Sequence, residues 1–159
     1  MKHRMLLCAA ALAVLAVLAL LAGCGQQKAP DAQQAAETAL RALYTADAGT
    51  AETLETALAD GDTAALEEQL RAGLDGGITD AGVQAAMENR LPTRAASQWP
   101  GQAVEVQDLE VTPSATATDT EQYFTYTLTA GPEGEDGAEF SGEIALVLQD
   151  GAWLVDGVS

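Results

Sequence analysis

Histidine and cysteine are nearly missing from this chain, and both are confined to its first 24 residues. The one histidine is His3, and the two cysteines are Cys8 and Cys24. The sequence after Cys24 therefore offers no imidazole and no thiol. This excludes Ser/His/Asp and Cys/His nucleophilic systems and His- or Cys-ligated zinc from that part of the chain. A single cysteine after residue 23 also excludes an internal disulfide there.

Basic residues are scarce too, with 7 lysines and arginines against 24 aspartates and glutamates and a formal net charge of −17. No acidic residue precedes Cys24, whereas Lys2 and Arg4 do. The chain from Cys24 onward thus has 5 bases (7 minus these two) against 24 acids, or −19. No basic cluster is available to contact a phosphate backbone, which argues against nucleic acid as a partner. The acidity is typical of a soluble, self-repelling surface.

The first 24 residues have the layout of a secretory signal. A positive start at Met1 to Arg4 is followed by an uncharged apolar run from Met5 to Ala22 and then by small residues. The sequence Leu21-Ala22-Gly23-Cys24 resembles the lipobox of bacterial lipoproteins.

This resemblance implies that a signal peptidase recognises Leu21, Ala22 and Gly23 and removes residues 1–23. It also implies that the thiol of Cys24 carries the lipid, palmitate among its acyl chains. Two or three acyl chains give a stable membrane anchor, whereas one gives only reversible binding. The expected location is the extracytoplasmic face of a bacterial membrane, in the cell envelope. The alternative is an uncleaved membrane-spanning helix, since the apolar run is about long enough to cross a bilayer.

Residues 24–31 are predicted to be the lipidated cysteine and a short tether, because Gly25 to Pro30 is polar and lacks periodicity. Such a tether reaches only about 20 Å when extended, so the domain is expected close to the membrane. Residues 32–159 are predicted to form a single acidic domain.

The first part of this domain has helical periodicity. Asp31 is expected to cap a helix over residues 32–46, with Ala36, Ala39, Leu40, Leu43 and Tyr44 on one face. We expect Thr50 to cap a second helix that ends at Asp60-Gly61, and Asp62 or Thr63 to cap a third that closes near Gly73 or Gly76-Gly77. A fourth is predicted to begin at Thr79 and to stop at Leu91-Pro92.

The second part alternates with a period of two, which indicates strands. Four strands are predicted, carrying Val104 to Val111 (with a bulge near Gln107-Asp108), Phe124 to Leu128, Phe140 to Leu148, and Ala152 to Val158. The hairpin signal Asp150-Gly151 predicts Leu148 opposite Trp153, Leu146 opposite Val155 and Ile144 opposite Gly157, facing the helices. On the other face it pairs Val147 with Leu154 and Ala145 with Asp156. That second face is apolar in part, which indicates a surface for a partner or a second subunit.

The fold class that follows is α+β, with N-terminal helices packed on one face of a four-stranded antiparallel meander sheet. The element order, the step Ala59-Asp60-Gly61-Asp62 and the closing hairpin from Asp150 to Val155 resemble the cystatin-like superfamily, and more narrowly its nuclear-transport-factor-like cone fold. The resemblance covers residues 32–159 and implies a cone fold.

Three groups of residues are candidates for chemistry. The acidic segment from Glu133 to Glu139 is interpreted as a solvated hairpin loop rather than a calcium loop, because Gly137 breaks the alternation of oxygen ligands. Cone-fold relatives include isomerases and dehydratases with an Asp or Tyr in an apolar cavity, which makes Tyr44, Tyr126 and Asp156 the residues to test. Trp99, followed by Pro100-Gly101, and Trp153 are interpreted as closing the end of the core rather than as recognition anchors.

The hypothesis from sequence is a membrane-anchored, non-catalytic domain that binds an envelope protein or a small ligand. It needs no cofactor, no metal and no catalytic residue. The alternative is an isomerase- or dehydratase-like enzyme using a cone cavity, and a third possibility is a surface module that responds to cations.

Overall fold

The computed structural model describes residues 31–114 and 116–159, so the signal, the lipobox and residues 24–30 of the tether lie outside the described residues. Within these described residues, five α-helices and a short 3-10 helix precede a four-stranded antiparallel sheet of order β1-β2-β3-β4. The predicted α+β class and the meander are therefore confirmed. No helix within the described ranges is long and apolar enough to cross a membrane.

The helices are α2 (Ala32–Tyr44), α3 (Ala48–Asp60), α4 (Thr63–Gly73), α5 (Asp80–Glu88) and α6 (Leu91–Arg94), followed by η1 (Ala96–Gln98). Asp31, Asp62 and Thr79 cap α2, α4 and α5 as predicted. Helix α3 also ends as predicted, at Gly61 in the left-handed conformation.

Three predicted helix boundaries are wrong. Helix α2 ends at Tyr44 rather than Ala46, because the backbone of Ala46 instead exchanges two hydrogen bonds with Val104. Helix α3 begins three residues earlier than expected. Its cap is Asp47, whose carboxylate accepts from the backbone N–H of Thr50 at 2.7 Å. Helix α5 ends at Glu88, three residues before the predicted stop at Leu91-Pro92, and Arg90 then adopts the left-handed conformation. Pro92 itself lies in the first turn of the next helix, α6, where no backbone donor is needed.

The strands are β1 (Glu105–Pro113), β2 (Glu121–Gly131), β3 (Ala138–Gln149) and β4 (Ala152–Val158). The bulge predicted near Gln107-Asp108 is present between Val106 and Asp108. The hairpin register is confirmed for Leu148 with Trp153, Leu146 with Val155 and Val147 with Leu154.

The last predicted pairs are wrong because β4 carries a second irregularity. Ala145 pairs with Gly157 and Ile144 pairs with Val158, each one residue later than expected. Asp156 is the extra residue in β4, as in a bulge. This shift turns Val158 into the core, where it is 4% exposed.

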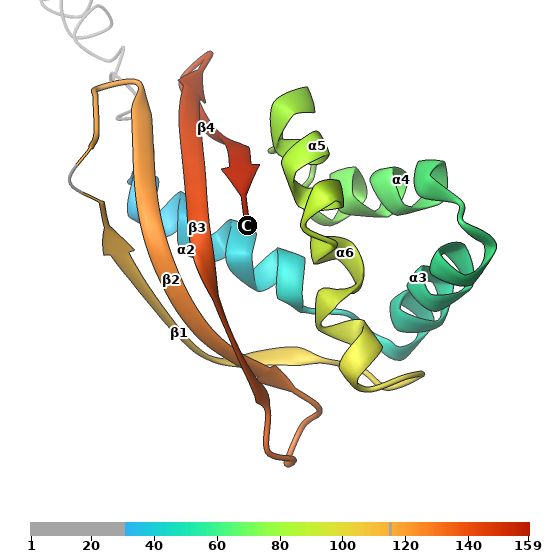
Figure 1. Cartoon of the computed structure of the whole chain (residues 1–159). Coiled ribbons are helices and arrows are strands. Elements are labelled where there is room, and N and C mark those ends of the chain that lie inside the picture. The colour runs from blue at the N-terminus through green and yellow to red at the C-terminus, as the bar shows by residue number, and fades with distance from the viewer. Residues whose placement is uncertain (1–30, 115) are drawn as a thin grey trace, which may run out of the picture.

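Helix α2 crosses one face of the sheet and contacts all four strands, while α5 lies beside β4 (Figure 1). The main core lies between these helices and the inward side chains of the strands, and Leu40, Leu128, Ile144, Leu146 and Val155 are at most 2% exposed. On the opposite face, here called the outer face, Tyr123, Thr125, Thr127, Ser141 and Glu143 are exposed.

A second, smaller cluster lies under α3 and α4, away from the sheet (Figure 1). Four of its six buried residues are alanine, and the other two are Leu54 and Leu66. The α3–α4 hairpin is therefore held by much less apolar surface than the sheet.

Candidate functional site

The fold brings together two of the three residues proposed for proton transfer. Tyr44, the last residue of α2, and Tyr126 of β2 have their hydroxyl oxygens 2.8 Å apart. Tyr44 also packs on Phe140, with ring centroids 5.2 Å apart, and Arg94 lies over that ring. The two tyrosines are 1% and 2% exposed, so they belong to the core.

The hydroxyls form a chain with a defined direction. The hydroxyl of Tyr126 donates to the backbone oxygen of Ser159 at 2.6 Å. A hydroxyl has one proton, so Tyr126 accepts from Tyr44, and the Tyr44 hydroxyl is the donor. Burial, and then the hydrogen bond with Tyr44, raise the pKa of Tyr126 far above its ordinary 10.0. Tyr126 therefore stays neutral, and its hydroxyl proton is already used in the hydrogen bond to the backbone oxygen of Ser159.

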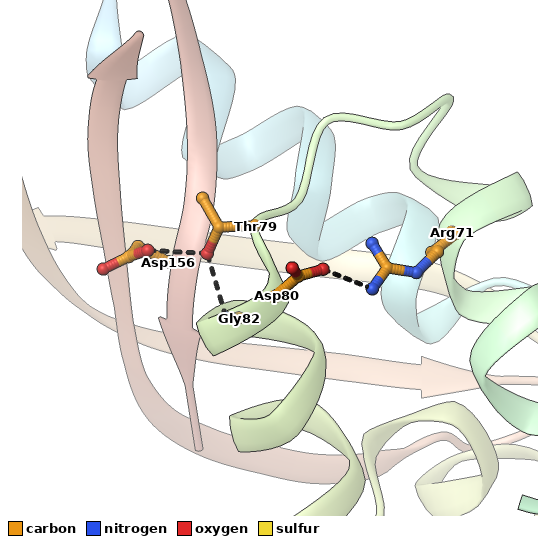
Figure 2. Close-up of polar contacts among 5 residues, drawn as sticks. All are labelled: Arg71, Thr79, Asp80, Gly82 and Asp156. Carbon is orange, nitrogen blue, oxygen red and sulfur yellow. Dashed lines mark hydrogen bonds and ion pairs between the residues drawn. The ribbon is translucent and has the colours of Figure 1, made fainter.

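Asp156, the third candidate, lies elsewhere and has a structural partner. It is exposed, and its carboxylate accepts from the hydroxyl of Thr79 at 2.6 Å (Figure 2). The Thr79 hydroxyl in turn accepts from the backbone N–H of Gly82 at 3.0 Å, which caps α5. Asp156 therefore joins β4 to the start of α5. Its negative charge also interacts favourably with the positive end of the helix dipole there.

Two further contacts hold the start of α5 against β4. The backbone N–H of Thr79 donates to the oxygen of Val155, and the N–H of Val155 donates to the oxygen of Gly77. These two hydrogen bonds cover part of the free edge of β4. Gly82 follows, and a Cβ on it would overlap the carbonyl oxygen of Val155. Asp80 points the other way and pairs with Arg71 of α4 at 2.7 Å (Figure 2).

The acidic segment from Glu133 to Glu139 forms the turn between β2 and β3 and the start of β3. The side-chain amide of Gln107 donates to the backbone oxygens of Pro132 and Glu135, so the turn is held through its backbone. Within the described part of the chain, no group of three or more His, Cys, Asp or Glu side chains is placed to hold a metal ion. Trp99 and Trp153 are both half-buried against the main core, which agrees with their interpretation as residues that close it.

A groove of about 640 Å³ lies at the end of the sheet opposite the turn between β2 and β3. It runs from the second half of α5, across β4, β3 and β2, to the loop between β1 and β2. Its volume is in the range of small-molecule sites. Three of its lining residues, Phe124, Ile144 and Val158, belong to the core and are at most 4% exposed, so they close its bottom.

The exposed part of this groove carries negative charge and one aromatic ring. Glu121 and Glu143 are in the lining, and no described lining residue is basic. Tyr123 is also in the lining, and it is 40% exposed, which makes it one of two large apolar side chains exposed among the described residues. The groove can therefore accept a positively charged ligand with an apolar portion.

The sequence did not single out Glu121, Tyr123 or Glu143. Alternation along β2 and β3 could have assigned all three to the outer face. What it could not supply was the register that places Glu143 near Tyr123. Comparisons of this chain with protein families, with curated proteins and with solved structures found no match.

Proposed function

We propose that this protein is a lipid-anchored, extracytoplasmic domain with a non-catalytic binding role, and that the groove beside Tyr123 is its binding site. One observation carries the binding role: the residues suited to proton transfer are occupied by structural hydrogen bonds, while the groove is open. Tyr126 is 2% exposed and donates to Ser159, and Asp156 accepts from Thr79.

The isomerase or dehydratase alternative needs a tyrosine and a carboxylate that meet a substrate in one cavity. The two buried tyrosines hydrogen-bond to each other, and the exposed Asp156 bonds to the cap of α5. No observation on the described residues favours that alternative. The cystatin-like relationship is likewise a proposal, supported by the order of helices and strands.

The anchor is proposed from Leu21-Ala22-Gly23-Cys24 and the apolar segment before it. The test is metabolic labelling with a palmitate analogue in a bacterial host that processes lipoproteins. We expect label on the wild type, and loss of both label and cleavage in Cys24→Ser. Cys8→Ser is the matched control and should be labelled and cut normally. A labelled, correctly cut Cys24→Ser protein would refute the anchor.

The binding role is tested by crosslinking on intact cells, comparing the wild type with a variant whose groove is blocked. Ala145→Trp places a large side chain beside Tyr123, because Ala145 and Tyr123 are paired across the strands. Thr127→Trp, on the same face but outside the groove lining, is the control. A crosslinked species that Ala145→Trp removes and Thr127→Trp retains supports the proposal. Equal crosslinking of both variants contradicts a role for the groove.

A further inference from the structure

We propose that the groove binds a linear aliphatic polyamine, with its two terminal ammonium groups at Glu121 and Glu143 and its chain across Tyr123. This inference rests on the proposed binding role and names the ligand chemistry of the same site. It is carried by the register of β2 and β3 together with the composition of the groove.

The strand pairing places three side chains in one row on the outer face. Glu121 and Tyr123 are two residues apart on β2, so both point to the same side. Glu143 pairs with Thr125, the next outward residue of β2. Glu121 pairs with Val147, four residues from Glu143. The Cα atoms of the two glutamates are therefore about 14 Å apart, along strands that rise about 3.4 Å per residue.

The middle of this row is suited to a carbon chain. Tyr123 pairs with Ala145, and Ala145 pairs with Gly157. Ala145 and Gly157 have almost no side chain, so no side chain projects far from the sheet next to the exposed ring of Tyr123. Between the two carboxylates a ligand thus meets an aromatic face and a small apolar floor. An ammonium group near Tyr123 gains a further attraction from the ring.

Charge selects a cation for this row. Residues 95–159 contain 12 acidic residues and no lysine, arginine or histidine. The arginines among the described residues are Arg41, Arg71, Arg90 and Arg94, all in the helical half of the chain. No basic side chain of the sheet is therefore available to neutralise Glu121 and Glu143. A ligand that carries both positive charges can do so.

The spacing selects two separate charges over one metal ion. A calcium ion needs its oxygen ligands within about 2.3–2.6 Å of one point. Carboxylates on backbones about 14 Å apart cannot converge in this way while the strands keep their pairing. A flexible linear amine can place one ammonium group at each.

The test is calorimetric titration of the full chain, in a non-ionic detergent, with spermidine at fixed ionic strength. Spermidine separates its end nitrogens by a chain long enough to reach both carboxylates, and butylamine, with one charge, is the comparison ligand. We expect saturable one-to-one binding of spermidine. Glu121→Gln, Glu143→Gln and Tyr123→Leu should each weaken it about two- to fivefold, as expected for exposed ion pairs and cation–π contacts.

The control is Glu139→Gln, which removes the same charge from the same face of β3 but lies outside the groove lining. Its affinity for spermidine should stay within about 1.5-fold of wild type, because a distant exposed charge is screened. Equal weakening by Glu139→Gln and Glu143→Gln would show general attraction to an acidic surface and would overturn the proposal. Butylamine binding as tightly as spermidine would also overturn it.

The ligand class and the binding role can fail separately. If spermidine gives no saturable heat while groove-dependent crosslinking persists on cells, the polyamine class is wrong and the binding role stands. If spermidine binds and is chemically altered, as mass spectrometry of the recovered ligand would show, the site is right and the non-catalytic role is wrong.

Discussion

The hydroxyl chain from Tyr44 through Tyr126 to Ser159 predicts an unequal effect of two similar substitutions. Tyr44→Phe and Tyr126→Phe each remove one oxygen from the core. Their consequences differ because Tyr126 is in the middle of the chain and Tyr44 is at its end. We expect Tyr126→Phe to destabilise the protein clearly more than Tyr44→Phe.

The magnitudes follow from the groups left without a partner. Tyr126→Phe leaves the buried hydroxyl of Tyr44 unbonded, at about 1–3 kcal/mol. It also removes a bond to the oxygen of Ser159, an exposed residue that water can reach. The expected total is about 2 kcal/mol. Tyr44→Phe removes only the bond that Tyr126 accepts, and the proton of Tyr126 stays bonded, so we expect about 0.5–1 kcal/mol.

The assay is urea unfolding followed by tryptophan fluorescence and far-ultraviolet circular dichroism. Trp99 and Trp153 are half-buried against the core and should report its loss. The urea dependence of the unfolding free energy should be the same in all variants. The double variant should lose less than the sum of the two single losses, because no Tyr44 hydroxyl is then left unbonded. A Tyr44→Phe loss equal to or larger than that of Tyr126→Phe would refute the proposed direction of the chain.

Three other predictions concern the same core and the start of α5. Folded Tyr126 keeps its proton above its ordinary pKa of 10.0, so its contribution to stability is complete below about pH 10 and declines as pH rises. The decline is about 1.4 kcal/mol per pH unit in the unfolding free energy, and Tyr126→Phe should remove it. Gly82→Ala should destabilise by about 1–3 kcal/mol, because a Cβ there meets the backbone of Val155. Gly73→Ala, with open space around its Cβ, should be neutral or stabilising in the same thermal unfolding assay. Thr79→Val should lower stability by about 1 kcal/mol and Thr79→Ser by much less, since only serine keeps the cap; equal losses would contradict the role of the hydroxyl.

The sequence predicted those parts of the fold that depend on neighbouring residues. The cap at Asp62, the hairpin at Asp150-Gly151 and the bulge after Val106 each have a local signal, and all are present. The bulge at Asp156 has none, because an extra residue in β4 leaves the composition of the strand unchanged. Missing it shifted the last two predicted pairs by one residue.

The candidate sites show the same limit. The sequence named Tyr44 and Tyr126 as separate candidates for proton transfer, but 82 positions separate them, and only the packing of α2 on β2 shows that their hydroxyls bind each other. The groove draws on α5, on three strands and on the loop after β1. No pattern within one of these segments could indicate it.

The alanine-rich cluster under α3 and α4 has a consequence for the order in which the molecule opens. An alanine side chain buries little apolar surface, so separating this hairpin from the rest requires less free energy than opening the sheet. The amides of α3 and α4 should exchange with deuterated solvent by a sub-global opening, while those in the middle of β2 and β3 exchange only when the whole chain unfolds. A protease would accordingly make its first internal cut in this hairpin, far from the groove.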